Sequence, residues 1–465
     1  MPRFAPDSRG LVVNVEANSD DEFDRHDAPR TSTGLVQHRE QKLMMKLGFS
    51  FFIFGLINNV LYVIILSAAL DLVPPSTPKG IIAFCNIAPA LVAKVAWPYI
   101  LKGRIHYARR LIGCCILSFL GMVIIALFDG LLVRLLGIAF ASFSSGLGEL
   151  TFLQLSTTYS PPPVAGHAVG YFASGTGAAG LVGAFLWWEV RGLGVRLGVG
   201  MSSVMPFIIP LTYHFLLPHS SAFLFAVTPT VYDSNFSPPP ALSTLPYTPL
   251  AAAEDEEGEE EGTYAPGPDK GTHLTVADKI RLVQPLLQKY MLPLFCGIGP
   301  TLLYPIPSKE ASWILSKIIH TVRDYYPLWQ LVYQTFVFLS RSSISMGLPP
   351  LPERLLPLPS VVQGVILSTL AYEAAVGFFG TPPDEPNQTK NIFFVFFLIC
   401  LEGICGGLAY VNVFYRINHE PPDANIRYND IELTRQAREF RIGSIGFADS
   451  TGILLASILA VSDRG

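Results

Sequence analysis

Long apolar segments alternate with short polar ones along most of the chain. Each apolar segment has almost no charge and is close to the roughly 20 residues that a helix needs to cross the hydrocarbon core of a bilayer. Backbone groups in lipid must be hydrogen-bonded within their own segment, so helices are the expected form. We predict about eleven transmembrane helices, near 47–70, 81–101, 111–128, 131–158, 164–188, 193–217, 282–304, 326–340, 355–379, 392–415 and 442–461.

The seventh span is the least regular of these helices. Lys289, Pro293, Pro300 and Pro305 interrupt an apolar length that is barely adequate. Proline removes a helix hydrogen bond and kinks or breaks a helix. We therefore expect a broken or damaged helix at this place.

Two polar segments divide the chain into domains. Residues 1–45 are polar and charged, and residues 218–280 combine Pro- and Ser-rich sequence with an acidic run at 254–261. Neither segment can bury enough apolar surface to fold, so both are predicted to be disordered and cytosolic. They leave an N-terminal six-helix bundle at 46–217 and a C-terminal bundle of about five helices at 281–465. The 218–280 loop contains Tyr-Thr-Pro-Leu at 247–250, a short and common sorting pattern through which trafficking adaptors could bind.

Lys and Arg residues beside the spans predict the orientation of the chain. They concentrate before span 1, after span 2 and between spans 10 and 11, which fall on one side of the membrane, and the positive-inside rule makes that side cytosolic. The N-terminus is then cytosolic as well. The opposite, lumenal loop at 380–390 carries Asn387 in an Asn-Gln-Thr sequon, a candidate for glycosylation. The basic residues are Arg39, Lys42, Lys46, Lys102, Arg104, Arg109, Arg110, Arg416, Arg427, Arg435 and Arg438.

Composition excludes several other classes of protein. Only 15% of the residues are charged, whereas a soluble protein has about 25%, and the net charge of −4 gives no reason to expect a nucleic-acid partner. The six cysteines lie in apolar stretches without a Cys-x-x-Cys pair, so no disulfide framework, metal site or cofactor is predicted. The sequence also has no His-Glu-x-x-His, aspartate pair or Gly-x-Ser-x-Gly on a suitable helix, so we predict no enzyme.

An internal repeat relates the two bundles. Span 5 contains Phe-Ala-Ser-Gly-Thr-Gly at 172–177, and span 11 contains Phe-Ala-Asp-Ser-Thr-Gly at 447–452. In both halves the preceding helix is Gly-rich and carries a glutamate, Glu149 in span 4 and Glu402 in span 10. The offset of six helices predicts two related halves, the plan of major-facilitator-type transporters. The predicted fold class is therefore an all-α polytopic membrane protein with a major-facilitator-like arrangement.

Ionisable residues inside the spans are the candidates for function, because a charge at mid-membrane must face a partner or a water-filled cavity. Glu149 and Glu402 lie on helices 4 and 10, which line the central cavity of major-facilitator proteins, so they could face each other and exchange a proton during transport. The alternative is that each glutamate pairs with a nearby Lys, Arg or Ser and only stabilises the fold. The other ionisable residues in or near the spans are Asp449, Glu373, Lys94 and His167.

Three further polar residues are candidates for the substrate or proton pathway. Asn58 and Asn59 lie midway along span 1, and two adjacent amides cannot both face lipid. Their simpler role is hydrogen bonding to a neighbouring helix. Arg341 ends span 8 and could bind an anionic substrate or headgroup, although an interfacial arginine is usually an anchor.

Several blocks of sequence are long enough to compare with known families: 55–69 (GLINNVLYVIILSAA), 144–153 (SSGLGELTFL), 339–343 (LSRSS), 401–412 (LEGICGGLAYVN) and 438–440 (REF) with 449–450 (DS). Together they resemble the battenin family of lysosomal or vacuolar membrane proteins, and the likeness is greatest to its fungal members. The resemblance implies a major-facilitator-like fold, a vacuolar or lysosomal membrane location, and roles in vacuolar pH homeostasis and transport. Cargoes proposed for the family include basic amino acids and glycerophosphodiesters.

The sequence departs from the family pattern around the seventh helix. The family has a longer apolar stretch with acidic and amide residues there, whereas residues 294–298 pass directly across that position. Residues 308–322 also look foreign to the pattern, and a mis-spliced gene model would explain both departures. We therefore expect a transporter with Glu149 and Glu402 in its cavity; the alternative is a non-transporting membrane scaffold that regulates trafficking or the vacuolar proton pump.

Overall fold

The computed structural model describes residues 28–68, 72, 80–100, 105–223, 274–298, 322–376, 388–420 and 431–462. The chain forms two compact units, residues 1–42 and 43–465, and the second contains the helical bundle. Within the described ranges all regular secondary structure is helical. The predicted all-α fold class is confirmed.

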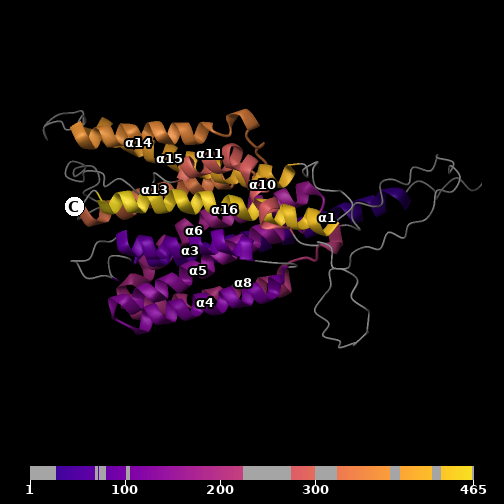
Figure 1. Cartoon of the computed structure of the whole chain (residues 1–465), viewed down its shortest axis with the longest axis horizontal. Helices are drawn as coiled ribbons and strands as arrows, with labels where there is room; N and C mark the ends of the chain where they lie inside the picture. Colours follow the sequence, from indigo (N-terminus) through magenta and orange to yellow (C-terminus); the bar gives the residue numbers. More distant parts are fainter. Residues whose placement is uncertain are drawn as a thin grey trace, which may run out of the picture. The chain divides into compact units, whose positions relative to one another are not determined.

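The helices of the second unit run side by side along a common direction (Figure 1). Each predicted span overlaps helical structure in the described ranges. The sixth predicted span (193–217) and the described part of the seventh (282–298) are broken into shorter helical pieces. The elements are α1 (Ala28–Ser67, which crosses the division between the units), α3 (Gly80–Ile100), α4 (Tyr107–Leu127), α5 (Leu131–Ser156), α6 (Pro162–Val190), η1 (Arg191–Leu193), α7 (Gly194–Ser202), η2 (Met205–Phe207), α8 (Ile208–Leu211), η3 (Thr212–Leu216), α10 (Val276–Leu286), η5 (Leu287–Met291), α11 (Leu292–Ile298), α13 (Val322–Arg341), η7 (Glu353–Leu355), α14 (Leu358–Val376), α15 (Gln388–His419) and α16 (Ile431–Ser462).

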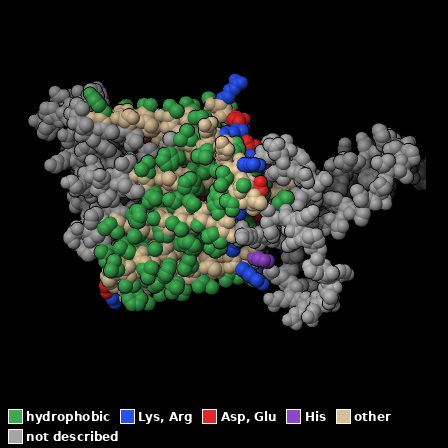
Figure 2. Space-filling view, in the orientation of Figure 1, with side chains coloured by type: hydrophobic (Ala, Val, Ile, Leu, Met, Phe, Trp, Pro, Cys, Tyr) green, Lys and Arg blue, Asp and Glu red, His purple; other side chains and the backbone are tan. Residues whose placement is uncertain are grey.

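The surface of the unit is that of a membrane protein. Hydrophobic side chains cover a broad band, and Lys, Arg, Asp and Glu gather mainly at one end, which we call the basic end (Figure 2). Large apolar side chains such as Leu132 and Phe215 are 81% and 87% exposed, which is expected only where lipid covers them. Of the described helices, six are long and apolar enough to cross a membrane: His38–Ser67, Tyr107–Leu127, Leu131–Ser156, Pro162–Trp187, Gly194–Phe223 and Phe396–His419.

Several helix pairs join the N-terminal half to the C-terminal half, among them α3 with α16, α6 with α13, α6 with α15, and α5 with α16. Within the halves, small residues let helices approach closely. A Cβ atom on Gly175 of α6 would collide with the carbonyl oxygen of Phe52 on α1, and one on Gly403 of α15 would lie 2.7 Å from the carbonyl oxygen of Tyr333 on α13. The Gly-rich sequence near Glu402 therefore serves helix packing.

Helix boundaries depart from the predictions where the chain leaves the bilayer. α1 begins at Ala28 rather than near residue 46, and α10 begins at Val276, inside the segment predicted to be disordered as far as residue 280. The Thr275 side chain caps α10 and forms a capping box with Asp278. Arg435 and Arg438, predicted to lie in a loop, belong to the first turns of α16. Charged, amphipathic sequence can extend a helix into water, which hydropathy alone does not reveal.

The seventh helix is broken, as predicted. A π-helical turn, η5, separates α10 from α11, and Pro285 and Pro293 lie on either side of it. Lys289 within this turn lies 2.6 Å from Glu353 and 2.8 Å from Glu420, so ion pairs hold the break in place. Residues 299–321, where the sequence departs from the family pattern, lie outside the described residues.

Candidate functional site

A buried lysine connects two buried carboxylates at the interface between the halves. Lys94 Nζ on α3 lies 2.8 Å from Glu149 Oε2 on α5 and 3.8 Å from Asp449 Oδ2 on α16. Its side chain is only 4% exposed, and those of Glu149 and Asp449 are 9% and 10% exposed. Because a buried charge is costly without a partner, the loss of any one of the three would leave the others poorly compensated.

The ion pairs continue into a longer polar chain. The Tyr410 hydroxyl on α15 donates a hydrogen bond to Glu149 Oε1 at 3.0 Å. The Arg341 guanidinium on α13 lies 4.1 Å from the centre of the Tyr410 ring and donates to Thr176 Oγ1 on α6 at 2.7 Å. We call the six residues Thr176, Arg341, Tyr410, Glu149, Lys94 and Asp449 the interbundle chain.

The interbundle chain crosses between the halves three times. Thr176–Arg341, Tyr410–Glu149 and Lys94–Asp449 each join a residue of the N-terminal half to one of the C-terminal half. Relative motion of the two halves must therefore break or remake these contacts. A charge change at any one of them would alter how the halves bind each other.

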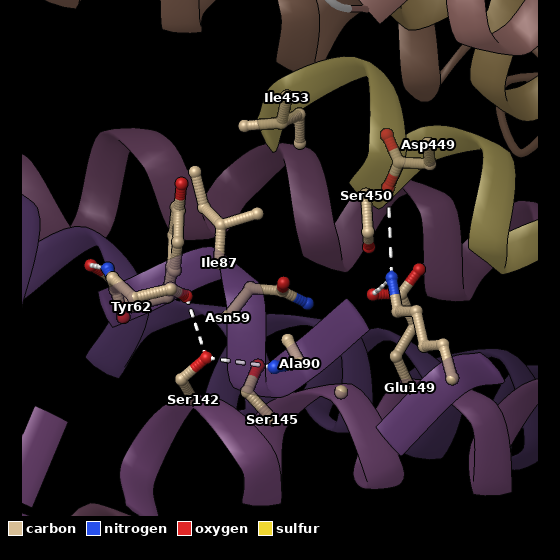
Figure 3. Close-up of a pocket in the computed structure, with 13 residues that line it drawn as sticks. Asn59, Tyr62, Ile87, Ala90, Ser142, Ser145, Glu149, Asp449, Ser450 and Ile453 are labelled. Carbon is tan, nitrogen blue, oxygen red and sulfur yellow. Dashed lines mark hydrogen bonds and ion pairs between the residues drawn. The ribbon is translucent and has the colours of Figure 1, made fainter. Parts of the chain in front are cut away.

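A pocket adjoins one end of the interbundle chain. It is lined by residues of α1, α3, α5 and α16, and its charged lining residues are Lys94, Glu149 and Asp449 (Figure 3). The other lining residues lie further from the basic end along their helices, among them Tyr62 on α1, Ser142 on α5 and Ile453 on α16. The pocket thus extends from the ion pairs away from the basic end.

Two residues that line the pocket each carry a buried side-chain oxygen without a partner among the described residues: Asp449 Oδ1 and Asn86 Oδ1. These residues are 7% and 1% exposed. The rest of Asn86 is held in place, since its Nδ2 donates to the Tyr62 carbonyl at 3.3 Å and its own carbonyl accepts from Ser142 Oγ at 2.7 Å. Buried acceptors without partners are rare in folded proteins and are frequent at binding sites.

On the other side of the ion pairs, the interface is closed at the basic end. Tyr107 on α4 donates to a Glu439 carboxylate oxygen on α16 at 2.8 Å, and Gln154 on α5 donates to the Glu439 carbonyl at 3.3 Å. Lys279 on α10 donates to the Pro98 carbonyl on α3 at 2.6 Å. These basic-end contacts, together with an apolar core drawn from both halves, separate the ion pairs from that end of the molecule.

The structure brings some predicted site residues together and separates others. Glu149 and Asp449 share Lys94, and Asn59 lines the pocket. Asn58 has the simpler role that was considered for it, since its Nδ2 donates to the Ser145 carbonyl on α5 at 3.0 Å. Arg341 is half-buried, and its contacts are with Thr176 and the Tyr410 ring in the interbundle chain.

The predicted pairing of Glu149 with Glu402 is not what the structure shows. Tyr410, not Glu402, is the α15 side chain that reaches Glu149, and Glu402 lies about two helical turns earlier on that helix. The neighbouring Gly403 faces α13. The rotation of α15 about its axis therefore decides the pairing, and hydropathy does not encode that rotation.

Other predicted residues lie away from the pocket or outside the described residues. His167 Nε2 lies 3.1 Å from the Met44 carbonyl, away from the pocket. Asn387, the side chain of Glu373 and the sorting pattern at 247–250 are not among the described residues. Sequence reasoning considered Lys94 only as a possible binding group for a phosphodiester substrate, and it missed Tyr410 and Thr176. The signal for Lys94 was charge balance, because two buried carboxylates require a cation.

The fold and the interbundle chain define a major-facilitator-type membrane protein. Two solved structures share the fold, each with a TM-score of 0.50: the human organic anion transporter MFSD10, 10% identical, covering 90% of this chain and 94% of that chain, and a bacterial homologue of the iron transporter ferroportin in an outward-facing state, 14% identical, covering 90% and 91%. At such low identity they establish the fold alone.

The chain belongs to the CLN3 protein family, whose model matches residues 49–463. It is 44% identical over 474 residues to a protein named Protein BTN1 from Cryptococcus neoformans var. neoformans serotype D (strain B-3501A), covering 89% of this chain and 91% of that protein. Protein BTN1 of Mycosarcoma maydis is 41% identical over 496 residues (93% and 88%), and Protein btn1 of Schizosaccharomyces pombe is 32% identical over 432 residues (90% and 92%). The predicted membership of the battenin family is confirmed.

Proposed function

We propose that this protein is a secondary transporter of the vacuolar (lysosomal) membrane, and not an enzyme, which moves a small solute by alternating access coupled to protons. Basic amino acids and glycerophosphodiesters are the candidate solutes, and the activity would contribute to vacuolar pH homeostasis. The observation that carries the proposal is the buried Lys94–Glu149–Asp449 cluster, which both joins the two halves and lines a pocket.

The geometry supports alternating access. The interface is closed at the basic end by the Tyr107, Gln154 and Lys279 contacts, while the pocket extends the other way from the cluster. With the basic end in the cytosol, as the positive-inside rule favours, this arrangement is a lumen-facing state. A cytosol-facing state would require the basic-end contacts to break.

Proton coupling follows from the shared lysine. A proton on Glu149 or Asp449 removes one of the two anions that hold Lys94 and so weakens a contact between the halves. The charged and titratable groups around these carboxylates are Lys94 from α3, Tyr410 from α15 and Arg341 from α13. Proton binding and movement of the halves are thereby linked.

Flux into vesicles tests this function. The full chain, reconstituted with a pH gradient, should take up radiolabelled L-lysine or glycerophosphocholine, and Glu149→Gln should reduce the flux by about a hundredfold or more, the scale expected for loss of a charged hydrogen-bond partner. Glu189→Gln is the matched control, because Glu189 is exposed near the end of α6. It should transport as the parent does.

Two outcomes would contradict the proposal. Equal flux in Glu149→Gln and the parent would exclude the carboxylate from the mechanism. Absence of any gradient-driven flux from the folded parent, with altered vacuolar pH in cells that lack the protein, would favour a scaffold that acts on trafficking or the proton pump. In that case adaptors bound through residues 218–280 would become the partners to seek.

A further inference from the structure

Lys94 holds the two carboxylates from within the protein. Its stem packs along α16, where a Cβ atom added to Gly446 would lie 3.7 Å from Lys94 Cδ. Its Nζ reaches Glu149 at 2.8 Å and the more distant Asp449 at 3.8 Å. The distance to Asp449 is longer than that of a good charge-assisted hydrogen bond, so Lys94 satisfies Glu149 well and Asp449 only partly.

The pocket beside Lys94 offers further acceptors. Asp449 and Asn86 line it, and the Oδ1 atom of each is buried without a partner among the described residues. In Figure 3 the second carboxylate oxygen of Asp449 points away from the Lys94 contact. A ligand that brings several N–H donors would satisfy these atoms, whereas an anionic group would meet further negative charge.

The formal charge of the residues that line the pocket also favours a cationic ligand. The charged residues that line the pocket are two carboxylates and one lysine, so their formal sum is one negative charge. A monovalent cation would neutralise it, and an anion would add to it. In a site that is largely shielded from water, this difference decides which ligand is admitted.

We propose that Lys94 is a specificity-determining residue that acts as an internal cation: it occupies Glu149 and Asp449 and is displaced by the side-chain ammonium or guanidinium group of the transported solute. The inference rests on the proposed transport function, because it names the ligand chemistry of the same site. Displacement of Lys94 Nζ from Asp449 breaks the ionic contact between α3 and α16. Ligand binding thereby releases one of the three crossings of the interbundle chain.

The proposal makes Lys94 a competitor of the ligand for the two carboxylates, so replacing Lys94 should strengthen ligand binding. Lys94→Met keeps the length of the stem and removes the charge. A ligand no longer has to displace Nζ, so the apparent affinity for L-lysine should rise by about fivefold or more, since a competent state is then populated more fully. Lys94→Arg keeps a cation and should bind no more tightly than the parent. Norleucine, which lacks the ammonium group of the lysine side chain, should not bind to any of the three proteins.

The measurement is binding of L-lysine by the purified full chain in lipid nanodiscs, with uptake into vesicles measured in parallel. Weaker binding in Lys94→Met than in the parent would overturn the proposal, because it would mean that Lys94 contacts the ligand or serves only to hold the fold. Preference of the parent for glycerophosphoglycerol, a phosphodiester without a cationic group, over L-lysine would also overturn it, and transport itself would still stand.

A second variant keeps the proposal testable should Lys94→Met fail to fold. Asp449→Asn retains the Lys94–Glu149 pair and removes the acceptor that Lys94 holds only at 3.8 Å. It should weaken L-lysine binding by about tenfold or more, on the scale of one charged contact. Unchanged binding would contradict the inference. Binding of L-lysine without flux in any vesicle would sink the transport function and leave the assignment of Lys94 intact.

Discussion

Two of the three crossings of the interbundle chain use the same repeated motif in different ways. In each, a cation from one half meets the Phe-Ala-x-x-Thr-Gly sequence of the other: Arg341 on α13 meets Thr176 on α6, and Lys94 on α3 meets Asp449 on α16. The third motif position is serine in the first contact and aspartate in the second. Ser174 bonds to Ser345 Oγ at 2.7 Å, whereas Asp449 lines the pocket.

The difference shows how a duplicated scaffold divides two tasks. The Thr176–Arg341 contact is a hydrogen bond from a guanidinium to a hydroxyl, with a Ser174–Ser345 hydrogen bond beside it, and it contains no carboxylate. The Lys94–Asp449 contact contains a carboxylate, and Lys94 also holds Glu149, so the proton and cation binding proposed above falls on this contact. One contact serves as a support, and the other is suited to binding.

Removing the cation of the charged contact should cost the most stability. Lys94→Met leaves Glu149 and Asp449 buried without a positive partner, and breaking a buried ion pair in this way costs about 3–5 kcal/mol. Thermal unfolding in lipid nanodiscs measures this loss. Adding Asp449→Asn to Lys94→Met should recover part of it; a double variant no more stable than the single one would mean that Asp449 is not held by Lys94.

Removing Arg341, the cation of the contact that contains no carboxylate, should cost less stability. Arg341→Met loses one hydrogen bond to Thr176 and the interaction with the Tyr410 ring, which together amount to about 1–3 kcal/mol. It leaves no carboxylate directly unpaired, so the loss of stability should be smaller than that of Lys94→Met in the same assay. A larger loss would reverse the assignment of support and binding between the two contacts.

The basic-end contacts offer a smaller change that acts on the equilibrium between states. Tyr107→Phe removes one hydrogen bond to Glu439, worth about 1 kcal/mol, and should favour opening of the basic end by roughly fivefold. A cysteine placed at Gln436 near the start of α16 would report the opening by its rate of labelling with a water-soluble maleimide. Thr335→Val on α13 is the control, because the Thr335 hydroxyl bonds within its own helix; equal labelling in Tyr107→Phe and this control would contradict the role of Tyr107.

The Lys289–Glu353 ion pair is exposed to water and should contribute least to the stability of the fold. The hydrogen bond from Lys289 holds the pKa of the Glu353 carboxyl below its usual value, and the charge of Lys289 acts in the same direction. A lowered pKa means that the pair stabilises the fold above the ordinary glutamate pKa and that this contribution is lost as the pH falls through the lowered value. The stability difference between the parent and Glu353→Gln, measured by thermal unfolding across pH, should therefore shrink on acidification. A difference that grows at low pH would contradict the pairing.

The sequence predicted the helices better than it predicted their contacts. The apolar length of each span is imposed by the bilayer, so all eleven segments coincide with helical structure. The ends of α1 and α16 were missed because no such limit acts on a helix that extends into water. Glu149 and Asp449 stood out because ionised groups are rare inside spans.

The pairing of those carboxylates was beyond sequence reasoning. Which residues of α15 face α5 depends on the rotation of a helix that is apolar on most sides, so Glu402 was expected where Tyr410 lies. A tyrosine in a membrane helix gives no signal by itself, since aromatic residues are common there. The repeat at 172–177 and 447–452 did identify the two helices that make the contrasting contacts.

A double-mutant cycle between Lys94 and Asp449 asks whether these residues form one ionic contact between the halves, on which both the transport mechanism and the role of Lys94 depend. Lys94→Met, Asp449→Asn and the double variant are compared with the parent by thermal unfolding in lipid nanodiscs. We predict a coupling energy of about 1–3 kcal/mol, as for other interacting pairs. Effects that add to within about 0.5 kcal/mol would show that the two residues act independently and that no such contact joins the halves.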